Sequence, residues 1–203
     1  MDLVEEIVPL RDRELAVLRP RDSESLIDEE AFERDERMPY WAELWPSGVE
    51  LARAVAGRAW RGARVVELGC GGIALPSIAA ALGGARVLAT DWSGEALSLA
   101  VRNAERNGAK LDVLEVAWGE PEELVAAGPF AAVLAADVLY ERRNVQLLLD
   151  LFALLRAPVW LADPNRPPLP EFLEGARERG FAVRSSGATE PARVGLHRLE
   201  PRA

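Results

Sequence analysis

Residues 63–74 read ARVVELGCGGIA, an apolar run that ends in an acidic residue and opens into a glycine-rich loop. The run favours a buried strand, and residues 75–82 favour a helix, so the stretch predicts a strand–loop–helix unit. Glycines in such a loop let the backbone approach a ligand closely, because no Cβ intervenes. The stretch therefore predicts an α/β fold with a ligand site where this strand ends.

The same alternation of apolar runs and helical segments continues to the C-terminus. Further strands are expected at 85–90, 111–116, 131–136, 158–162, 181–185 and 193–199. Helices are expected at 49–56, 75–82, 93–107, 144–155 and 169–179, with Ser93 as an N-cap and Gly108 as a stop signal. The last two strands have no room for a helix between them. The pattern predicts a Rossmann-like, seven-stranded, mostly parallel sheet with helices on both faces and a C-terminal antiparallel hairpin.

The first 38 residues differ from the rest of the chain. Residues 5–10 and 14–18 alternate in hydropathy and predict a weak hairpin, and the charge-rich residues 22–37 predict a short helix or ordered arm. We expect residues 1–38 to form an arm packed on one domain that spans 39–203. Trp41 is expected to pin this arm to the domain.

Composition excludes several classes of protein. The chain has 203 residues, of which 49 % are hydrophobic and 28 % charged, as in soluble globular proteins. Its formal net charge of -9 and its lack of a basic run argue against a nucleic-acid partner. It shows no signal peptide and no membrane span, and its single cysteine, Cys70, forms no intramolecular disulfide. We therefore expect a cytoplasmic protein that does not bind membranes.

Polar and aromatic side chains gather where the five parallel strands end. Ligands of open α/β sheets bind beyond these carboxyl ends, so the residues there are the candidate site. In strand order they are Glu67 with Gly69 and Gly71, Asp91 with Trp92, Trp118, Asp137 with Tyr140, and Asp163 with Asn165 and Arg166.

The glycine loop permits more than one interpretation. Residues 69–74 satisfy G-x-G-x-x-A, with Asp91 near the spacing of a ribose-binding acid, which is compatible with an NAD-dependent oxidoreductase. In the other interpretation the ligand is S-adenosylmethionine (AdoMet). Glu67 suits its cationic amino-acid end better than it suits a pyrophosphate. A non-catalytic scaffold with a degenerate loop is a further alternative.

Five elements together resemble a known family. They are Pro39-Tyr40-Trp41-Ala42 with Trp45-Pro46, Glu67-Leu68-Gly69-Cys70-Gly71, Asp91, Asp137-Val138-Leu139-Tyr140, and residues 162–167 (ADPNRP). Their order and spacing resemble class I, seven-β-strand AdoMet-dependent methyltransferases. The likeness is to the family 16 branch, which includes protein-lysine methyltransferases, and within it to the subgroup that acts on the electron transfer flavoprotein β subunit. It covers residues from about 36 to the C-terminus.

The resemblance implies an enzyme with AdoMet as cofactor that N-methylates a protein side chain, lysine first, by direct in-line transfer. A small-molecule amine or other metabolite is the alternative acceptor. It also implies roles for the candidate residues. Gly69 and Gly71 would line the methionine portion near Glu67, Asp91 would hold the ribose, and Trp92 and Trp118 would flank the adenine. Trp45 and Ser47 would close the pocket. Asp137 and Tyr140 would face the methyl group and the acceptor, and Asp137 would also contact the cofactor.

Three residues after the fifth strand, Asp163, Asn165 and Arg166, are expected to form a substrate loop. A structural ion pair between Asp163 and Arg166 is the alternative. The carboxylates have no His or Cys partners at metal-ligand spacing, so no metal site is predicted.

Overall fold

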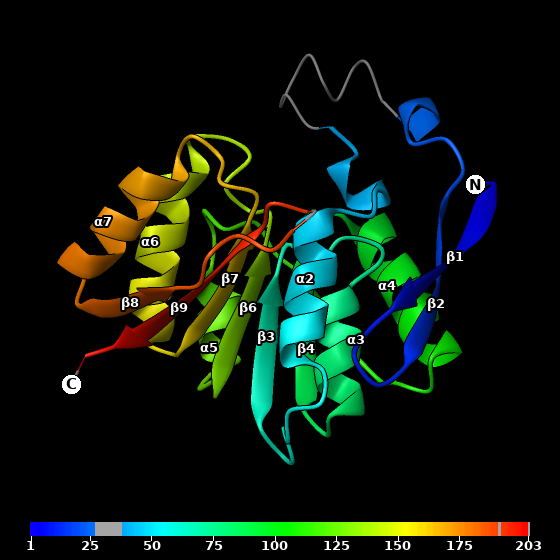
Figure 1. Ribbon diagram of the computed structural model, residues 1–203, viewed down its shortest axis with the longest axis horizontal. Coiled ribbons are helices and arrows are strands. Elements are labelled where there is room, and N and C mark those ends of the chain that lie inside the picture. Colours follow the sequence, from blue (N-terminus) through cyan, green and yellow to red (C-terminus); the bar gives the residue numbers. More distant parts are fainter. Residues whose placement is uncertain (27–37, 191, 203) are drawn as a thin grey trace.

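A computed structural model describes residues 1–26, 38–190 and 192–202. A seven-stranded sheet lies between two layers of helices (Figure 1), in the strand order β5-β4-β3-β6-β7-β9-β8. The strands are β3 Arg64–Leu68, β4 Arg86–Asp91, β5 Asp112–Glu115, β6 Ala132–Ala136, β7 Val159–Asp163, β8 Phe181–Ser185 and β9 Gly195–Pro201. The first five are parallel, and β9 pairs antiparallel with both β7 and β8. The predicted fold class is confirmed.

Two hydrophobic clusters fill the two faces of this sheet. The helices of the first cluster are α2 Pro46–Val55, α3 Leu75–Leu82 and α4 Gly94–Arg106, and those of the second are α5 Glu122–Ala126, α6 Asn144–Leu155 and α7 Leu169–Glu178. Neighbouring residues of β3 divide between the clusters, because successive side chains of a strand point to opposite faces. Val65 belongs to the first and Val66 to the second, and both are fully buried. Burial on both faces explains why the strands read as continuous apolar runs.

The element boundaries follow local signals. The Ser93 Oγ accepts a hydrogen bond from the Ala96 N–H, which confirms this residue as the N-cap of α4. Helix α2 begins at Pro46, three residues before the expected start, because proline is favoured in the first turn of a helix. Strand β9 begins at Gly195 rather than at residue 193. Helix α5 was not expected, since its five residues are too few to show helical periodicity.

The predicted N-terminal hairpin is confirmed as a separate two-stranded sheet. Strands β1 Leu3–Pro9 and β2 Glu14–Pro20 pair antiparallel, and β2 packs against α4. Two short 3-10 turns follow, η1 Glu24–Leu26 and η2 Tyr40–Ala42. Most of the helix expected over residues 22–37 falls on 27–37, which lie outside the described residues.

Two asparagines, Asn103 in α4 and Asn107 at its C-cap, hold the hairpin by bonding to it as a neighbouring strand would. The Asn103 carboxamide accepts from the Leu18 N–H at 2.7 Å and donates to the Leu18 carbonyl at 2.9 Å. Asn107 makes the same pair of bonds with Ala16, at 3.0 and 2.9 Å. Four residues of helix rise about 6 Å, and two residues of strand span about 6.6 Å, so the two registers match. The free edge of β2 is thereby paired rather than exposed.

Among the residues that the structure describes, we find no helix with both the length and the apolar character needed to cross a membrane.

We expect Asn103→Ala to lower the free energy of unfolding by about 2–4 kcal/mol, because the change removes the partner of two part-buried backbone groups of Leu18 and of the buried Gly72 carbonyl. Urea denaturation followed by circular dichroism measures this loss. Ser98→Ala, an exposed position on the same helix, is the matched control and should change stability by less than about 0.5 kcal/mol. Equal stability of the two variants would show that the asparagine clamp contributes nothing.

Candidate active site

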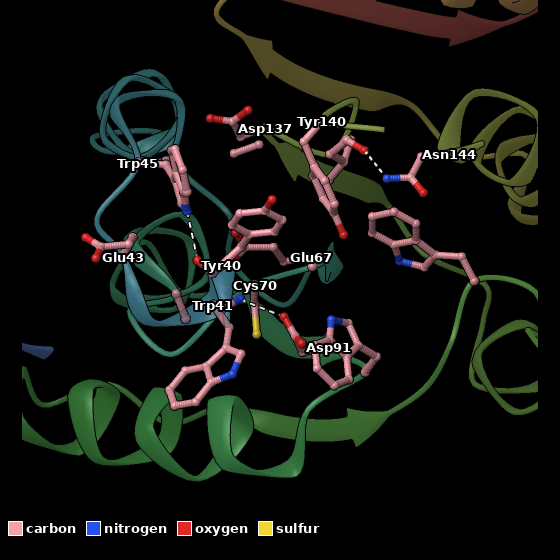
Figure 2. Close-up of a pocket in the computed structure, with 18 of the residues that line it drawn as sticks. Tyr40, Trp41, Glu43, Trp45, Glu67, Cys70, Asp91, Asp137, Tyr140 and Asn144 are labelled. Carbon is pink, nitrogen blue, oxygen red and sulfur yellow. Dashed lines mark hydrogen bonds between the residues drawn. The ribbon is translucent and has the colours of Figure 1, made fainter. Parts of the chain in front are cut away.

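A cavity of about 810 Å³ opens at the carboxyl edge of the parallel strands. This lies within the usual range of ligand sites, roughly 300–1,000 Å³. Its walls come from η2 and the start of α2, the loop after β3, the ends of β4 and β6, the segment after β5, and the loop after β7. Figure 2 shows side chains from these separate segments facing one space.

The loop after β3 forms one wall and requires glycine at two positions. Gly69 and Gly71 have φ angles of 64° and 60°, in the left-handed region that side chains disfavour. A Cβ on Gly69 would lie 3.1 Å from the Trp118 ring, and one on Gly71 would lie 3.2 Å from the Trp41 carbonyl oxygen. Substitution of either residue would therefore strain the backbone and crowd its neighbours.

The next residue, Gly72, ties this loop to its surroundings. Its N–H donates to the Trp41 carbonyl at 2.8 Å, and its own carbonyl accepts from Asn103 Nδ2 at 2.8 Å. Trp41 is buried in one cluster with Ala96 and Leu99 of α4, and Leu3, Leu18 and Leu26 pack against that cluster. Trp41 and Asn103 of α4 together fix the loop from outside the cavity.

Asp91, at the end of β4, supports the loop from inside. One carboxylate oxygen, Oδ2, accepts from the Gly71 N–H at 3.0 Å, and the other, Oδ1, accepts from the Ser93 N–H at 3.0 Å. The residue is only 5 % exposed. Burial raises its pKa to about 6, against the opposing effect of these hydrogen bonds. Each oxygen keeps a lone pair, so this carboxylate can also bind a ligand's hydroxyl groups.

Glu67, in β3, lies deeper in the same wall. Its Oε2 atom accepts from the Ser77 N–H at the start of α3, at 2.8 Å. Because the side chain is almost fully buried, its pKa is raised to about 8. A cationic ligand group nearby would favour the charged form of this carboxyl.

The opposite end of the cavity is aromatic (Figure 2). The rings of Tyr40 and Tyr140 meet edge to face with centroids 5.3 Å apart, and Trp45 donates from Nε1 to the Tyr40 carbonyl at 2.8 Å. Burial raises the pKa of Tyr140 to about 12, so its hydroxyl stays protonated at neutral pH. Asp137 stands beside these rings with a φ of 58°, and its Oδ1 accepts from Arg166 Nε at 2.5 Å.

Most of the predicted site residues share this cavity. Those that line it are Trp45, Glu67, Gly69, Gly71, Asp91, Trp92, Trp118, Asp137, Tyr140 and Arg166. Ser47 does not line it, because it is fully buried in α2. Asp163 and Asn165 lie outside it and shape the loop after β7: Asp163 Oδ1 accepts from the Arg166 N–H at 2.7 Å, and Asn165 Nδ2 donates to the Arg193 carbonyl.

The alternative of an Asp163–Arg166 ion pair is wrong, because the guanidinium of Arg166 pairs with Asp137 instead. Sequence reasoning gave no site role to Tyr40 or Asn144, which line the cavity, or to Asn103. Tyr40 lies within the motif Pro39-Tyr40-Trp41-Ala42, which is a usable signal. No such signal marks Asn103, because its role depends on α4 lying between strand β2 and the glycine loop after β3.

Within the described residues, no three His, Cys, Asp or Glu side chains are grouped to hold a metal ion. The ionisable lining is instead mostly acidic and suits an organic cation. It consists of Glu43, Glu67, Asp91, Asp137 and Glu141 against Arg143 and Arg166, together with Tyr40, Cys70 and Tyr140. Burial raises the pKa of Cys70 and of Tyr140.

Comparisons with known proteins identify the family. A family model described as lysine methyltransferase matches residues 31–159. The chain is 37 % identical over 141 residues to the electron transfer flavoprotein β subunit lysine methyltransferase of Xenopus laevis, covering 63 % of this chain and 53 % of that protein. It is 36 % identical over 95 residues to the protein N-lysine methyltransferase METTL21A of Danio rerio, covering 44 % and 43 %. The chain thus spans about half the length of these curated relatives.

Solved structures give the same fold. A ribosomal protein L11 methylase from Lactobacillus delbrueckii subsp. bulgaricus superposes with a TM-score of 0.59 at 25 % identity, over 76 % of this chain and 79 % of that one. A 16S rRNA N2 G1207 methyltransferase of T. thermophilus, in complex with AdoMet and guanosine, superposes with a TM-score of 0.70 at 15 % identity, over 98 % and 51 %. The second likeness concerns the fold alone.

The buried acids predict a stability that falls as pH rises. Glu67 and Asp91 bind protons more tightly folded than unfolded, so the folded state loses stability from about pH 4 through about pH 8. We expect Glu67→Gln to remove about 1–3 kcal/mol of this loss between pH 5 and pH 8. Thermal unfolding across that range measures it, with Glu105→Gln as an exposed control. A wild-type melting temperature that rises with pH would contradict the expectation.

Proposed function

Because the chain belongs to the lysine methyltransferase family, we propose that it transfers a methyl group from AdoMet to a lysine side chain of a protein. The observation that carries the proposal is one continuous cavity with two unlike ends. One end holds Asp91 beside the glycine loop, and the other holds Asp137 among aromatic rings. A reaction between two bound molecules needs such a pair of adjoining sites.

The residues at the first end fit AdoMet. Backbone without Cβ atoms at Gly69 and Gly71 gives close approach to a ligand, and Asp91 offers carboxylate oxygens suited to two ribose hydroxyls. Glu67 lies where it would face a cationic amino-acid group. Trp92 and Trp118 line the same region and would contact the adenine. When bound, AdoMet supplies a methyl group already activated on a positively charged sulfur.

The second end suits a lysine chain. Tyr40, Trp45 and Tyr140 offer apolar ring surface for the four-carbon stem, and aromatic faces also attract cations. Asp137 can accept an N–H from the amine and so direct its lone pair at the methyl carbon. Tyr140 keeps its proton, so its ring forms part of the cavity wall and its hydroxyl can form hydrogen bonds, but it does not act as a base. Water at the open mouth takes the proton that the ammonium must lose.

The acceptor we place first is the β subunit of an electron transfer flavoprotein, which the name of the Xenopus laevis relative gives as that protein's substrate. A small-molecule amine is the second acceptor class. An RNA acceptor is suggested only by structural neighbours whose identity to this chain is too low to support more than the fold. An NAD-dependent reaction is disfavoured by the family match.

Calorimetric titration with S-adenosylhomocysteine tests the cofactor, with NAD as the parallel ligand. We expect micromolar binding of the first and none of the second. Asp91→Asn should weaken binding by about 10–100-fold, because a hydrogen bond to a charged group contributes about 1.5–3 kcal/mol. Glu95→Gln, exposed at the start of α4, is the control and should bind as the wild type does. Binding of NAD alone would overturn the proposed cofactor.

Labelled AdoMet tests the acceptor, with a purified flavoprotein β subunit, a small amine and an RNA hairpin assayed side by side. We expect label only in the protein, on a lysine located by mass spectrometry. Asp137→Asn should lower the rate at least 100-fold while changing the dissociation constant of S-adenosylhomocysteine by less than about threefold. Glu123→Gln, exposed on α5, is the control. Normal turnover in Asp137→Asn would remove this carboxylate from the reaction.

A further inference from the structure

Asp137 does not stand alone at the acceptor end of the cavity. Its carboxylate is bound by the guanidinium of Arg166, which comes from the loop after β7, and Oδ1 lies 2.5 Å from Nε. The Asp137 side chain is 7 % exposed and that of Arg166 is 28 % exposed, so the pair is largely shielded from water. A charge-assisted hydrogen bond in such surroundings is strong.

The backbone holds both members of the pair in place. The Asp137 N–H donates to the Ala162 carbonyl at 2.9 Å, which extends the pairing of β6 with β7 by one residue. In the loop after β7, Asp163 Oδ1 accepts a hydrogen bond from the Arg166 N–H, and Asn165 Nδ2 donates one to the Arg193 carbonyl. The guanidinium carbon also lies 6.0 Å from the centroid of the Trp45 ring. The pair is thus built into the scaffold and is not a loose surface contact.

The charges around Asp137 make this partner important. The ionisable groups that share its cavity are Tyr40 from η2 and Glu43 directly after it, Glu67, Cys70 and Asp91 from the ends of β3 and β4, Tyr140, Glu141 and Arg143 from the segment after β6, and Arg166. Asp163 binds the backbone of the same loop as Arg166. Of the two arginines in this set, Arg143 forms an ion pair with Glu141. Arg166 is therefore the cation that balances Asp137 itself.

An unbalanced carboxylate would oppose the reaction. An opposite charge within about 4–6 Å favours the charged form of a titrating group, so a lone Asp137 would hold the acceptor as an ammonium. An ammonium has no lone pair and cannot attack the methyl group. A lysine amine already has an ordinary pKa of about 10.4, so further stabilisation of its charged form would slow transfer at neutral pH.

We propose that Arg166 is a positioning residue that orients Asp137 and neutralises its charge, so that the acceptor lysine is held as the uncharged amine. The inference rests on the proposed function. In the step, the ammonium first gives its proton to water. The nitrogen lone pair then forms the N–C bond while the S–C bond breaks and its electron pair goes to sulfur. Arg166 takes no part in the bonds that change and acts through Asp137.

Steady-state kinetics of Arg166→Gln, with Arg166→Lys as the charge-keeping partner, test the proposal on the labelled-methyl assay from pH 7 to pH 10. At pH 7.5 we expect Arg166→Gln to lower kcat about tenfold, with an acceptor KM unchanged or lower, because the freed carboxylate binds the ammonium. In the pH profile of kcat, the rising part should move to higher pH by about one unit. The kcat of Arg166→Gln should therefore be only about twofold below that of wild type near pH 9.5. Arg166→Lys should stay within about threefold of wild type.

Readouts beyond turnover keep the result interpretable. Arg166→Gln should bind S-adenosylhomocysteine within about threefold of wild type, since Arg166 contacts Asp137 and Trp45 at the acceptor end. The double variant Asp137→Asn/Arg166→Gln removes both charges and guards against misfolding from an unpaired buried carboxylate. Its kcat should lie below that of wild type but show the wild-type pH profile. In the wild type, the nuclear magnetic resonance signal of the Arg166 Nε–H proton should lie downfield of its position in a solvent-exposed arginine. In Asp137→Asn the signal should move back to that ordinary position.

Several results would overturn the inference. One is a kcat of Arg166→Gln that is lowered equally at every pH, and another is a raised acceptor KM of that variant at unchanged kcat. A third is an Arg166→Lys variant as impaired as Arg166→Gln. The fourth is a double variant whose pH profile of kcat is shifted from that of wild type. A wild-type protein that binds S-adenosylhomocysteine but methylates no lysine would overturn the proposed function first. Failure of the proposed function is thus seen in the wild type, and failure of the inference alone is seen in the variants.

Discussion

The chain must turn from β3 into α3 within six residues and keep the backbone at Gly69 and Gly71 open to the cavity, and the rest of the site depends on how that turn is held. Glycine alone permits the left-handed backbone at Gly69 and Gly71 at low cost. The same freedom makes the loop expensive to order, because glycine loses the most conformational entropy on folding. Contacts from outside the loop therefore have to fix it.

Three hydrogen bonds supply these contacts. Asp91 binds Gly71 from the ligand side, and the Trp41 carbonyl and Asn103 bind Gly72 from the other side. Asn103 also clamps the N-terminal hairpin, so β2, α4 and the glycine loop share one side-chain amide. The hairpin thus has a structural reason to be present although it lies outside the main sheet. It completes the hydrogen bonding of a residue on which the ligand loop relies.

What could be predicted from the sequence was local or periodic. Apolar runs predicted the strands of the main sheet, Ser93 predicted a helix cap, and the glycine spacing with Asp91 predicted the wall of the cavity. What could not be predicted depends on packing between distant segments. Arg166 and Asp137 are 29 residues apart, and their pairing follows from the adjacency of β6 and β7. Ser47 does not line the cavity, because α2 begins at Pro46 and turns that residue into the core.

The two ends of the cavity use carboxylates in opposite ways. Glu67 and Asp91 are buried and accept hydrogen bonds from backbone N–H groups, and burial raises the pKa of both carboxyls. A cationic group bound beside them would therefore favour their charged forms. That arrangement favours a cationic ligand that should stay cationic. The charge of Asp137 is already balanced by the Arg166 guanidinium. Asp137 can therefore orient the acceptor amine without strongly favouring its positively charged form. A methyl transfer to an amine needs both conditions at once, since the donor must keep its charge and the acceptor must lose it. The loop after β7 meets both conditions because its Arg166 pairs with Asp137, while Glu67 and Asp91 remain to interact with the ligand.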